Sequence, residues 1–399
     1  MSGYDAVVVG GRCAGSVIAL AMAKAGADVL VIDRDELGSD TLSTHFMFPN
    51  TIARLEQLGV LERLDAGHEL RPVLCGARIL GREMSGPFTP IEGRDRALGI
   101  TRPTLDRALG EAAAAAGAEM RFATKVTGLV GSGTEDDPVS GVEFEDGSRI
   151  EAPLVIGADG RASFVARTLE LDKREQLSSD ISMLFAYFRG LPDADHFWLD
   201  VNDRRGVNWL PCEDGVDLLL AFGHPDFSRG DAETRRLRLL ETLHDFPEVF
   251  YPGSLDDAEM ISEVRVVPEP MLHGFFRQAA GPGWALVGDA GHFKHPASAQ
   301  GISDAVEQAL YVADALGGAD PELSGYEAWR ERRAAGHYEW SFRLGSMPKA
   351  KTAGPIFDGI TADPEIEQEF RDTLSRTVNP REMLSPERLE SWFAATPAS

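Results

Sequence analysis

Two short apolar runs near the start of the chain, separated by a segment of helical periodicity, predict a strand, a helix and a second strand. Residues 6–9 and 29–32 are uninterrupted apolar runs, as expected for strands buried on both faces. Between them, Val17, Leu20 and Ala21 recur at the spacing of one helix face. A glycine-rich turn precedes this helix, so the segment predicts the βαβ unit in which a dinucleotide binds.

The turn of this unit holds the residue types that a bound pyrophosphate needs. Gly10 and Gly15 let backbone N–H groups and the helix N-terminus approach the phosphates. Asp33, after the second run, is the acidic residue expected to accept the ribose hydroxyls. Arg12 stands where a second glycine is expected, so its side chain must point away from the phosphates or pair with one. The candidate cofactor-binding residues of this segment are Gly10, Gly11, Arg12, Ala14, Gly15, Asp33 and Arg34.

Helices and strands continue to alternate over the next part of the chain. Helical spacing with start and stop residues predicts helices over 50–59 and 103–117. Residues 71–100 lack helical periodicity and predict strands and loops that leave the first domain. Strands are expected near 119–130, 139–145 and 154–156, with a hairpin turn at Asp146 and Gly147.

From residue 181 to residue 224 the pattern changes to long strands rich in aromatic residues. These strands predict an antiparallel sheet that forms a wall of a substrate pocket. Because successive side chains of a strand point to opposite faces, only part of the aromatic set can face the pocket. The candidates are Phe185, Tyr187, Trp198, Trp209 and Phe222.

The rest of the chain is predicted to return to the first domain and then to become helical. A helix over 232–243 and a strand over 260–267 lead to a buried strand over 284–287. Residues 346–399 predict a loop followed by helices over 364–375 and 386–393, without a recognisable motif.

Composition indicates a large enzyme of a reducing compartment. The chain has 399 residues, 43% of them hydrophobic, which suggests two or three domains. A net charge of −25 argues against nucleic-acid or anionic-membrane partners, and an anionic nicotinamide cofactor would need a locally basic patch. No apolar run is long enough to span a membrane, and three cysteines make no disulfide framework. The first strand leaves no room for a signal peptide, so a cytoplasmic location is expected, while the oligomeric state is not predicted.

An ordered set of motifs carries a resemblance to a known family. Besides the N-terminal turn, the motifs are Arg102 before a helix, Asp159-Gly160 after a strand, Gly288-Asp289 after another strand, Pro296, and Gly301-Ile302 at a helix start. In this order and over roughly residues 4–340, the chain resembles the group A FAD-dependent monooxygenases, the para-hydroxybenzoate hydroxylase superfamily.

The resemblance implies an α/β fold with a Rossmann-like FAD-binding domain of the glutathione-reductase type, an inserted antiparallel-sheet substrate domain and a helical C-terminal segment. The expected ranges are 1–70, 98–176 and 272–345 for the FAD-binding domain, 71–97 and 177–271 for the substrate domain, and 346–399 for the C-terminal segment.

The resemblance also assigns roles to residues of the motifs. Asp289, after Gly288, would bind the ribityl chain of FAD, and Arg102 would contact the FAD backbone. The Pro296 loop and the helix N-terminus at Gly301 and Ile302 would face the pyrimidine end of the flavin, where a helix dipole stabilises negative charge. The Asp159-Gly160 turn is associated with both FAD and the nicotinamide cofactor. Ala299 and Ser303 depart from the glycine and asparagine of the family's loop.

Three histidines, His45, His292 and His295, lie close to these motifs in the sequence. In the family, the chain between Asp33 and the next helix passes near the isoalloxazine, so Thr44 and His45 are candidates to line the ring or the substrate, and His45 is the catalytic candidate. A histidine bonded only to the backbone is an equal alternative for His45. His292 and His295 lack acidic or cysteine partners, and no metal site is predicted.

The implied activity is that of an NAD(P)H-consuming monooxygenase. With FAD and molecular oxygen, it would hydroxylate or epoxidise an apolar ring-containing small molecule through a C4a-hydroperoxyflavin, with NADPH or NADH as transient donor. The alternatives are a geranylgeranyl-reductase-like enzyme that saturates a double bond, a flavin-dependent halogenase, and a non-catalytic FAD-binding protein. Residues 207–211 match the halogenase signature only in part.

Overall fold

The computed structural model describes residues 3–43, 45–318, 320 and 323–395, and it confirms the predicted α/β fold. A six-stranded sheet with the order β20-β21-β11-β1-β2-β7 forms the centre of the first domain. Its strands are β1 (Ala6–Val9), β2 (Val29–Ile32), β7 (Glu119–Arg121), β11 (Val155–Gly157), β20 (Ala280–Gly281) and β21 (Trp284–Leu286). All neighbouring strands are parallel except the pair β20 and β21, so the carboxyl ends of the parallel strands meet at one edge.

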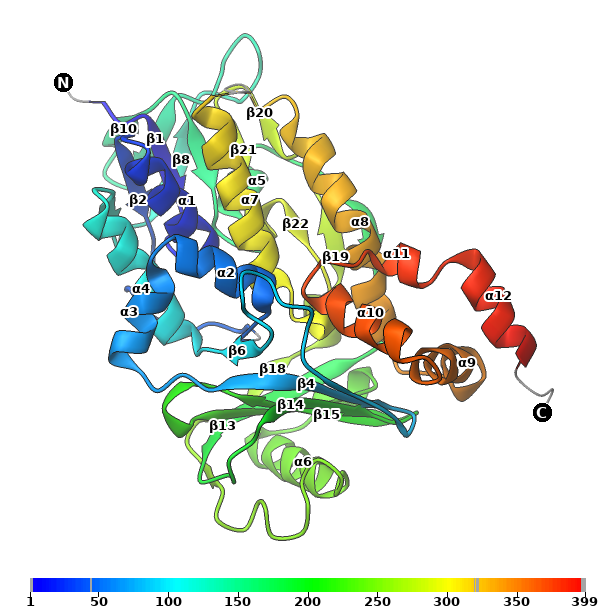
Figure 1. Cartoon of the computed structure of the whole chain (residues 1–399). Helices are drawn as coiled ribbons and strands as arrows, with labels where there is room; N and C mark the ends of the chain where they lie inside the picture. Colours follow the sequence, from blue (N-terminus) through cyan, green and yellow to red (C-terminus); the bar gives the residue numbers. More distant parts are fainter. Residues whose placement is uncertain (1–2, 44, 319, 321–322, 396–399) are drawn as a thin grey trace.

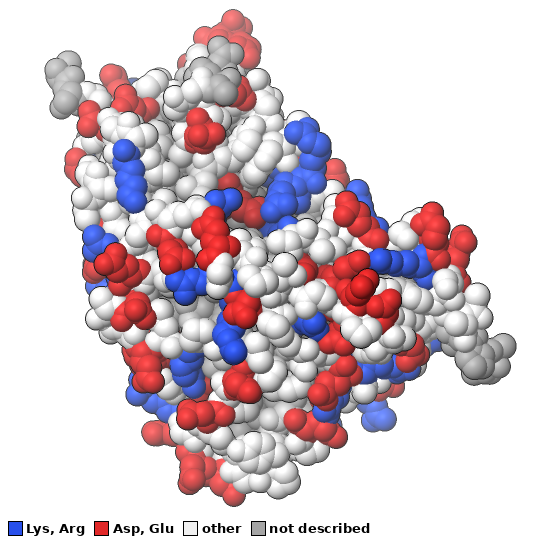
Figure 2. Space-filling view, viewed as in Figure 1, with Lys and Arg blue, Asp and Glu red and all other residues white. Residues whose placement is uncertain are grey.

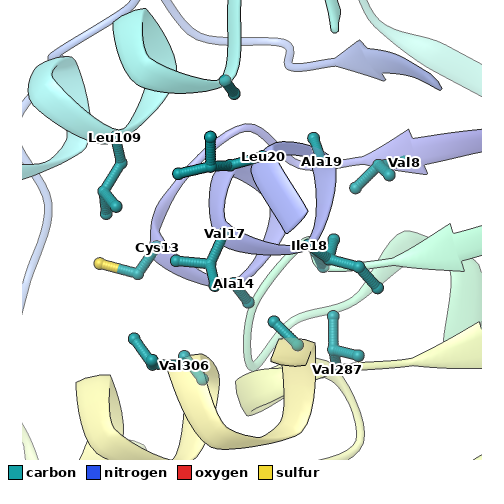
Figure 3. Close-up of a cluster of buried hydrophobic side chains, with 14 of the residues drawn as sticks. Val8, Cys13, Ala14, Val17, Ile18, Ala19, Leu20, Leu109, Val287 and Val306 are labelled. Carbon is teal, nitrogen blue, oxygen red and sulfur yellow. The ribbon is translucent and has the colours of Figure 1, made fainter. Parts of the chain in front are cut away.

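Helix α1 (Cys13–Lys24) lies in the core of this domain, between α4 (Arg102–Ala115) and α7 (Gly301–Leu316). Figure 3 shows Leu109 of α4 and Val306 of α7 on different sides of α1. The apolar residues of α1 therefore extend around the whole helix, and Val17, Ile18 and Ala19 are fully buried. A Cβ atom at Gly288 would lie 3.1 Å from the Cβ of Ala14 in α1 and 3.6 Å from the Cβ of Ala305 in α7, so the first turns of the two helices lie near each other.

The other face of the six-stranded sheet is covered by a small antiparallel sheet and a short helix. The sheet consists of β8 (Val126–Val130), β9 (Gly141–Phe144) and β10 (Arg149–Glu151), and the helix is α5 (Phe164–Thr168). The predicted strand over 119–130 is thus two strands in two sheets, because Ala123 turns the chain with φ 50°.

A ten-stranded sheet forms the second layer and lies below the first domain in Figure 1, with α6 (Ala232–His244) on its far side. Its strands are β3 (Phe46–Met47), β4 (Pro72–Ile79), β5 (Arg82–Gly86), β6 (Ala97–Gly99), β13 (Ser182–Arg189), β14 (His196–Val201), β15 (Arg205–Pro211), β16 (Asp217–Gly223), β17 (Glu259–Met260) and β18 (Arg265–Val267). Strand β3, which lies in the first part of the chain, pairs with β6 at the end of this sheet. The predicted strand over 260–267 is interrupted, and its two ends pair separately with β13. The predicted domain boundaries stay a prediction.

The remaining elements connect the layers. A three-stranded sheet contains β12 (Arg174–Leu177), β19 (Gly274–Phe276) and β22 (His292–Phe293). The other helices are α2 (Pro49–Gln57), α3 (Val60–Gly67), α8 (Tyr326–Leu344), α9 (Ala350–Thr361), α10 (Pro364–Leu374), α11 (Pro380–Met383) and α12 (Pro386–Ala395). The sequence did not predict α9, because Pro355 inside this helix reads as a breaker. Helices α9 to α12 extend to one side of the molecule in Figure 1.

The surface carries charges of both signs. On the face seen in Figure 2, acidic and basic side chains are interspersed. Within the residues that the structure describes, no helix combines the length and apolar character needed to cross a bilayer.

Candidate functional site

The glycine turn between β1 and α1 has no room for side chains at two positions. Gly10 has φ 104°, and a Cβ atom there would lie 2.5 Å from the carbonyl oxygen of Ala158. A Cβ atom at Gly15 would lie 1.7 Å from the carbonyl oxygen of Gly10. These contacts require glycine, and they bring the start of α1 against the ends of β1 and β11.

The N-terminus of α1 is open to an anion. Arg12 is the N-cap residue, and no side chain among the described residues caps the helix. Its guanidinium donates to the carbonyl oxygen and the hydroxyl of Ser39 at 3.2 and 3.1 Å and forms an ion pair with Asp35 at 3.2 Å. The side chain of Arg12 therefore points away from the expected phosphate position, as one of the two alternatives from the sequence required. The N–H groups at the start of α1 are left as donors for a ligand.

Asp33 closes the turn after β2. It is 8% exposed, and its Oδ2 accepts a hydrogen bond from the backbone N–H of Gly11 at 2.6 Å. Its Oδ1 accepts from the N–H of Asp35 at 2.9 Å. A carboxylate has about four acceptor positions, so Asp33 can also accept from ribose hydroxyls. Arg34 is exposed and lies beside Asp35.

Asp289 lies in a second turn that packs on the start of α1. In the 3₁₀ turn Gly288–Ala290, Gly288 has φ 61°, and a Cβ atom there would lie 3.1 Å from the Cβ of Ala14. The half-buried carboxylate of Asp289 accepts no hydrogen bond from any described residue. Burial, followed by the charge of Asp304, raises the pKa of Asp289 to about 6. A desolvated acceptor without a partner suits the hydroxyl groups of a ligand.

Asp159 and Arg102 flank these turns. Asp159 Oδ2 accepts from the N–H groups of Phe164 and Val165 at 2.6 and 3.1 Å, which caps α5. Its Oδ1 is buried and has no partner among the described residues, and burial raises its pKa. Gly160 follows with φ 73°. Arg102 is buried at the start of α4, donates to both carboxylate oxygens of Asp106 at 3.0 Å, and its charge lowers the pKa of Asp289 against the effect of burial.

The loop from Pro296 to the start of α7 contains two features that the sequence did not predict. After the 3₁₀ turn Pro296–Ser298, Ala299 has φ 49°, the left-handed conformation that favours glycine. The next residue, Gln300, is fully buried and donates to the carbonyl oxygens of Thr373 and Leu374 at 2.7 and 3.0 Å. The end of α10 therefore holds this loop in place. No side chain of the described residues caps α7, so the N–H groups of its first turn, at Gly301 and Ile302, are available as donors.

A buried charge cluster anchors the first turn of α7. Asp304 forms ion pairs with Lys294, at 2.6 Å, and with Arg376. Although burial raises it, the pKa of Asp304 is held below its ordinary value by Arg376 and Lys294, while burial lowers the pKa of Lys294 to about 8. Lys294 directly follows β22, Asp304 lies in α7, and Arg376 follows α10. The cluster therefore joins the C-terminal segment to the first domain.

His45 and Tyr187, predicted separately, form a contact between the two layers. His45 Nε2 is hydrogen-bonded to the hydroxyl of Tyr187 on β13, and the rings stack with centroids 5.5 Å apart. Burial, followed by the charge of Arg102, lowers the pKa of His45 to about 3, and burial raises the pKa of Tyr187. Both groups are thus neutral, and the buried Nδ1 of His45 has no partner among the described residues. Thr44 lies outside the described residues.

The aromatic candidates divide between the two faces of the ten-stranded sheet. Phe185, Tyr187 and Phe222 lie on the inner face, toward the first domain. Trp198 and Trp209 lie on the outer face and pack in the cluster below α6. Trp209 also donates to Asp217 Oδ1 at 2.9 Å and stacks on Phe250. The two tryptophans are therefore core residues of the outer layer, and the inner three remain pocket candidates.

The other histidines have structural surroundings. His292 is buried and stacks on Phe276, and Nδ1 of His295 accepts from the N–H of Ala297 at 3.1 Å. Among the residues that the structure describes, no three histidine, cysteine or acidic side chains gather as metal ligands do.

Comparison with known proteins identifies a family model and several relatives. The model described as FAD binding domain matches residues 3–340. Menaquinone reductase of Mycolicibacterium smegmatis is 26% identical over 371 residues, which cover 88% of this chain and 87% of the relative. Digeranylgeranylglycerophospholipid reductase of Methanosarcina mazei is 28% identical over 329 residues, which cover 78% and 74%.

Solved structures share the fold at lower identity. The flavin-dependent brominase Bmp2 matches with a TM-score of 0.77 and 17% identity over 99% of this chain and 98% of the brominase. PqsL of P. aeruginosa in complex with 2-aminobenzoylacetate matches with a TM-score of 0.71 and 21% identity over 86% and 96%. One of these proteins is named a brominase and the other is described as a probable FAD-dependent monooxygenase, so the shared fold alone does not select a reaction.

Proposed function

Because the chain belongs to the FAD-binding-domain family and is a flavin-dependent oxidoreductase, we propose that it oxygenates an apolar, ring-containing small molecule. The observation that carries the proposal is the neutral pair of the fully buried His45 and the half-buried Tyr187. This pair lies where the inner face of the ten-stranded sheet meets the first domain, and Arg102 is within electrostatic reach of both His45 and Asp289.

The residues of the first domain fit FAD. The uncapped N-terminus of α1 would hold the pyrophosphate, Asp33 the ribose and Asp289 the ribityl hydroxyls. The uncapped N-terminus of α7 would stabilise negative charge at the pyrimidine end of the ring. When bound and reduced by NAD(P)H, FAD supplies the electrons and the reaction with oxygen.

The inner face of the sheet would orient the substrate and exclude water. Phe185 and Phe222 are buried in the apolar cluster of this face and would form the dry wall behind a planar ring. The neutral phenol of Tyr187 would donate a hydrogen bond to a polar substituent of that ring. His45 would hold the tyrosine hydroxyl in place by donating from Nε2 to the phenol oxygen, which leaves the phenol O–H free to donate to the substrate.

A second candidate function is the reduction of an isoprenoid double bond. It is favoured by the two reductases that match more than 70% of this chain and of their own length. Such a reaction adds a hydride and a proton across a carbon–carbon double bond, and Tyr187 would then be the proton donor. The same pair of residues therefore serves either reaction, and oxygen use distinguishes them.

Labelled oxygen is the direct test. The FAD-loaded protein is screened with alkylphenols, fused-ring phenols and a prenylated naphthoquinone for compounds that stimulate NAD(P)H oxidation. We expect the product of the best compound to contain one atom of labelled dioxygen. A product that forms equally well without oxygen and gains two hydrogen atoms would establish the reductase instead.

Substitution of the tyrosine tests the residue roles. Tyr187→Phe is expected to lower kcat by about 100-fold, the usual contribution of a positioned proton-transfer group, with FAD occupancy unchanged. Tyr251→Phe is the matched control, because Tyr251 is 52% exposed on the outer layer. Equal kcat values for the two variants would remove Tyr187 from the mechanism.

A further inference from the structure

A groove crosses the end of the six-stranded sheet that lies opposite the candidate flavin site, and its volume is about 1320 Å³. Asp5, Leu154 and Gly283 line it, and they directly precede the parallel strands β1, β11 and β21. Gly10 and Asp33 of the candidate flavin site instead directly follow β1 and β2. The groove therefore lies at the amino edge of the sheet, which in Figure 1 is the end with β20, away from the ten-stranded sheet.

The groove has an apolar part that joins the two cores on either face of the sheet. Leu154 and Leu316 pack against the core that contains α1 and α7, and Leu171 packs against the core of the other face. All three leucines are half-buried, so part of their apolar surface stays open to the groove. The volume exceeds that of the usual small-molecule pocket, about 300–1,000 Å³, and leaves room for an element of another protein.

The charged side chains of the groove are five carboxylates and one arginine. Glu135, Glu170 and Asp172 are exposed and form no ion pair with a residue that the structure describes. Arg174, the arginine of the groove, is already paired with Glu327 at 2.9 Å. Charges of one sign around an apolar groove attract a ligand of the opposite charge and orient it, so this groove fits a cationic partner with apolar side chains.

We propose that this groove docks a basic amphipathic helix of a partner protein. The apolar face of that helix would pack on the three leucines, and its lysine or arginine side chains would reach the unpaired carboxylates. A strand is the less suitable element, because the edge strand β20 has only two residues, Ala280–Gly281, to pair with it. The proposal is independent of the proposed function, since the flavin site lies at the other edge of the sheet.

Two synthetic peptides test the groove on the FAD-loaded protein. The first has about 14 residues, with leucines on one helix face and lysines on the other, and the second has the same composition with the leucines spread around the helix. Fluorescence anisotropy of the labelled peptides measures each Kd. We expect the first peptide to bind at least about 10-fold more tightly, because only its leucines can enter the groove together.

Two double variants test the carboxylates. Glu135→Gln with Asp172→Asn should raise the Kd of the first peptide about fivefold at low salt and less at high salt, because exposed ion pairs are weak and screened. Glu62→Gln with Asp256→Asn is the matched control, with the same change of charge at exposed positions in α3 and in the segment between α6 and β17. The control should change the Kd less than about twofold.

Three results would overturn the proposal. The first is equal affinity for the two peptides, which would show attraction by the net charge of −25 alone. The second is equal affinity of the two double variants for the first peptide. The third is a dimer in light scattering that the first peptide dissociates, which would assign the groove to a second copy of this chain. None of these measurements involves turnover, so they are distinct from a failure of the proposed function.

Discussion

Asp289→Asn should weaken FAD binding and at the same time stabilise the apoprotein. The carboxylate is half-buried, accepts no hydrogen bond from the described residues and lies near the like charge of Asp304. Asparagine has the same shape without the charge. The substitution therefore removes a strong acceptor for the ribityl hydroxyls and also removes an unfavourable buried charge.

Both magnitudes follow from the surroundings of Asp289. A hydrogen bond to a charged group contributes about 1.5–3 kcal/mol, so the Kd for FAD should rise about 10- to 100-fold. A carboxyl pKa raised from 3.8 to about 6 makes ionisation in the folded apoprotein less favourable by about 3 kcal/mol as an upper limit. Solvent screening of a half-buried group reduces this, and we expect the variant apoprotein to gain about 1–2 kcal/mol at pH 7.

The pH dependence has opposite signs for folding and for cofactor binding. Because the folded-state pKa of Asp289 is raised, its contribution to apoprotein stability is fully present below about pH 4 and is lost as the pH rises through about 6. The ionised carboxylate is the better acceptor, so FAD affinity should instead increase through the same range. In Asp289→Asn both of these dependences should disappear.

Flavin fluorescence titration and urea unfolding of the apoprotein, each from pH 4 to pH 8, measure the two effects. Asp136→Asn is the control with the same charge change, because Asp136 is exposed in the loop between β8 and β9. Unchanged FAD affinity in Asp289→Asn would show that the ribityl chain lies elsewhere. An unchanged apoprotein stability would show that the carboxylate is better solvated than its surroundings indicate.

Three further substitutions test the elements around the site. Ala299→Gly should raise the free energy of unfolding by about 1 kcal/mol, because it relieves a left-handed alanine; a loss of stability in urea unfolding would contradict this. Arg376→Met should lower the free energy of unfolding by about 3–5 kcal/mol, because Asp304 loses one of its two buried ion-pair partners. A change below about 1 kcal/mol would contradict the role of this charge cluster in anchoring α7. Trp209→Phe should destabilise the protein by about 1–3 kcal/mol, because the hydrogen bond to Asp217 is lost. The KM for the substrate should stay unchanged. A changed KM at constant stability would contradict the position of Trp209 on the outer face.

The fold could be predicted because its signals are local in the sequence. The apolar runs of β1 and β2 and the glycines of the first turn act within a few residues of each other. Gly10 and Gly15 are required by the path of the backbone itself. The same is true of the Gly288 turn. Such features identify a dinucleotide fold before any tertiary contact is known.

The composition of the pocket could not be predicted, because it depends on which face of a strand another element covers. Alternation along β13 to β16 marks two aromatic sets but does not say which set is inner. Helix α6 decides this by packing on the face of Trp198 and Trp209. The contact of His45 with Tyr187 joins residues 142 positions apart, and no local pattern predicts such a distance.

The altered flavin loop illustrates how distant residues can maintain a motif that has lost its glycine. Ala299 adopts the left-handed conformation that favours glycine, at a cost of about 1–2 kcal/mol. Two buried hydrogen bonds from Gln300 to the end of α10, and the ion pairs of Asp304 with Lys294 and Arg376, hold the loop and α7 in this position. Each buried polar contact of this kind would leave an unsatisfied group if the loop moved, so together they exceed the cost of the alanine. The C-terminal segment is therefore the element that holds the N-terminus of α7 in the position where it would face the flavin, and the change of sequence at Ala299 is no argument against a cofactor site there.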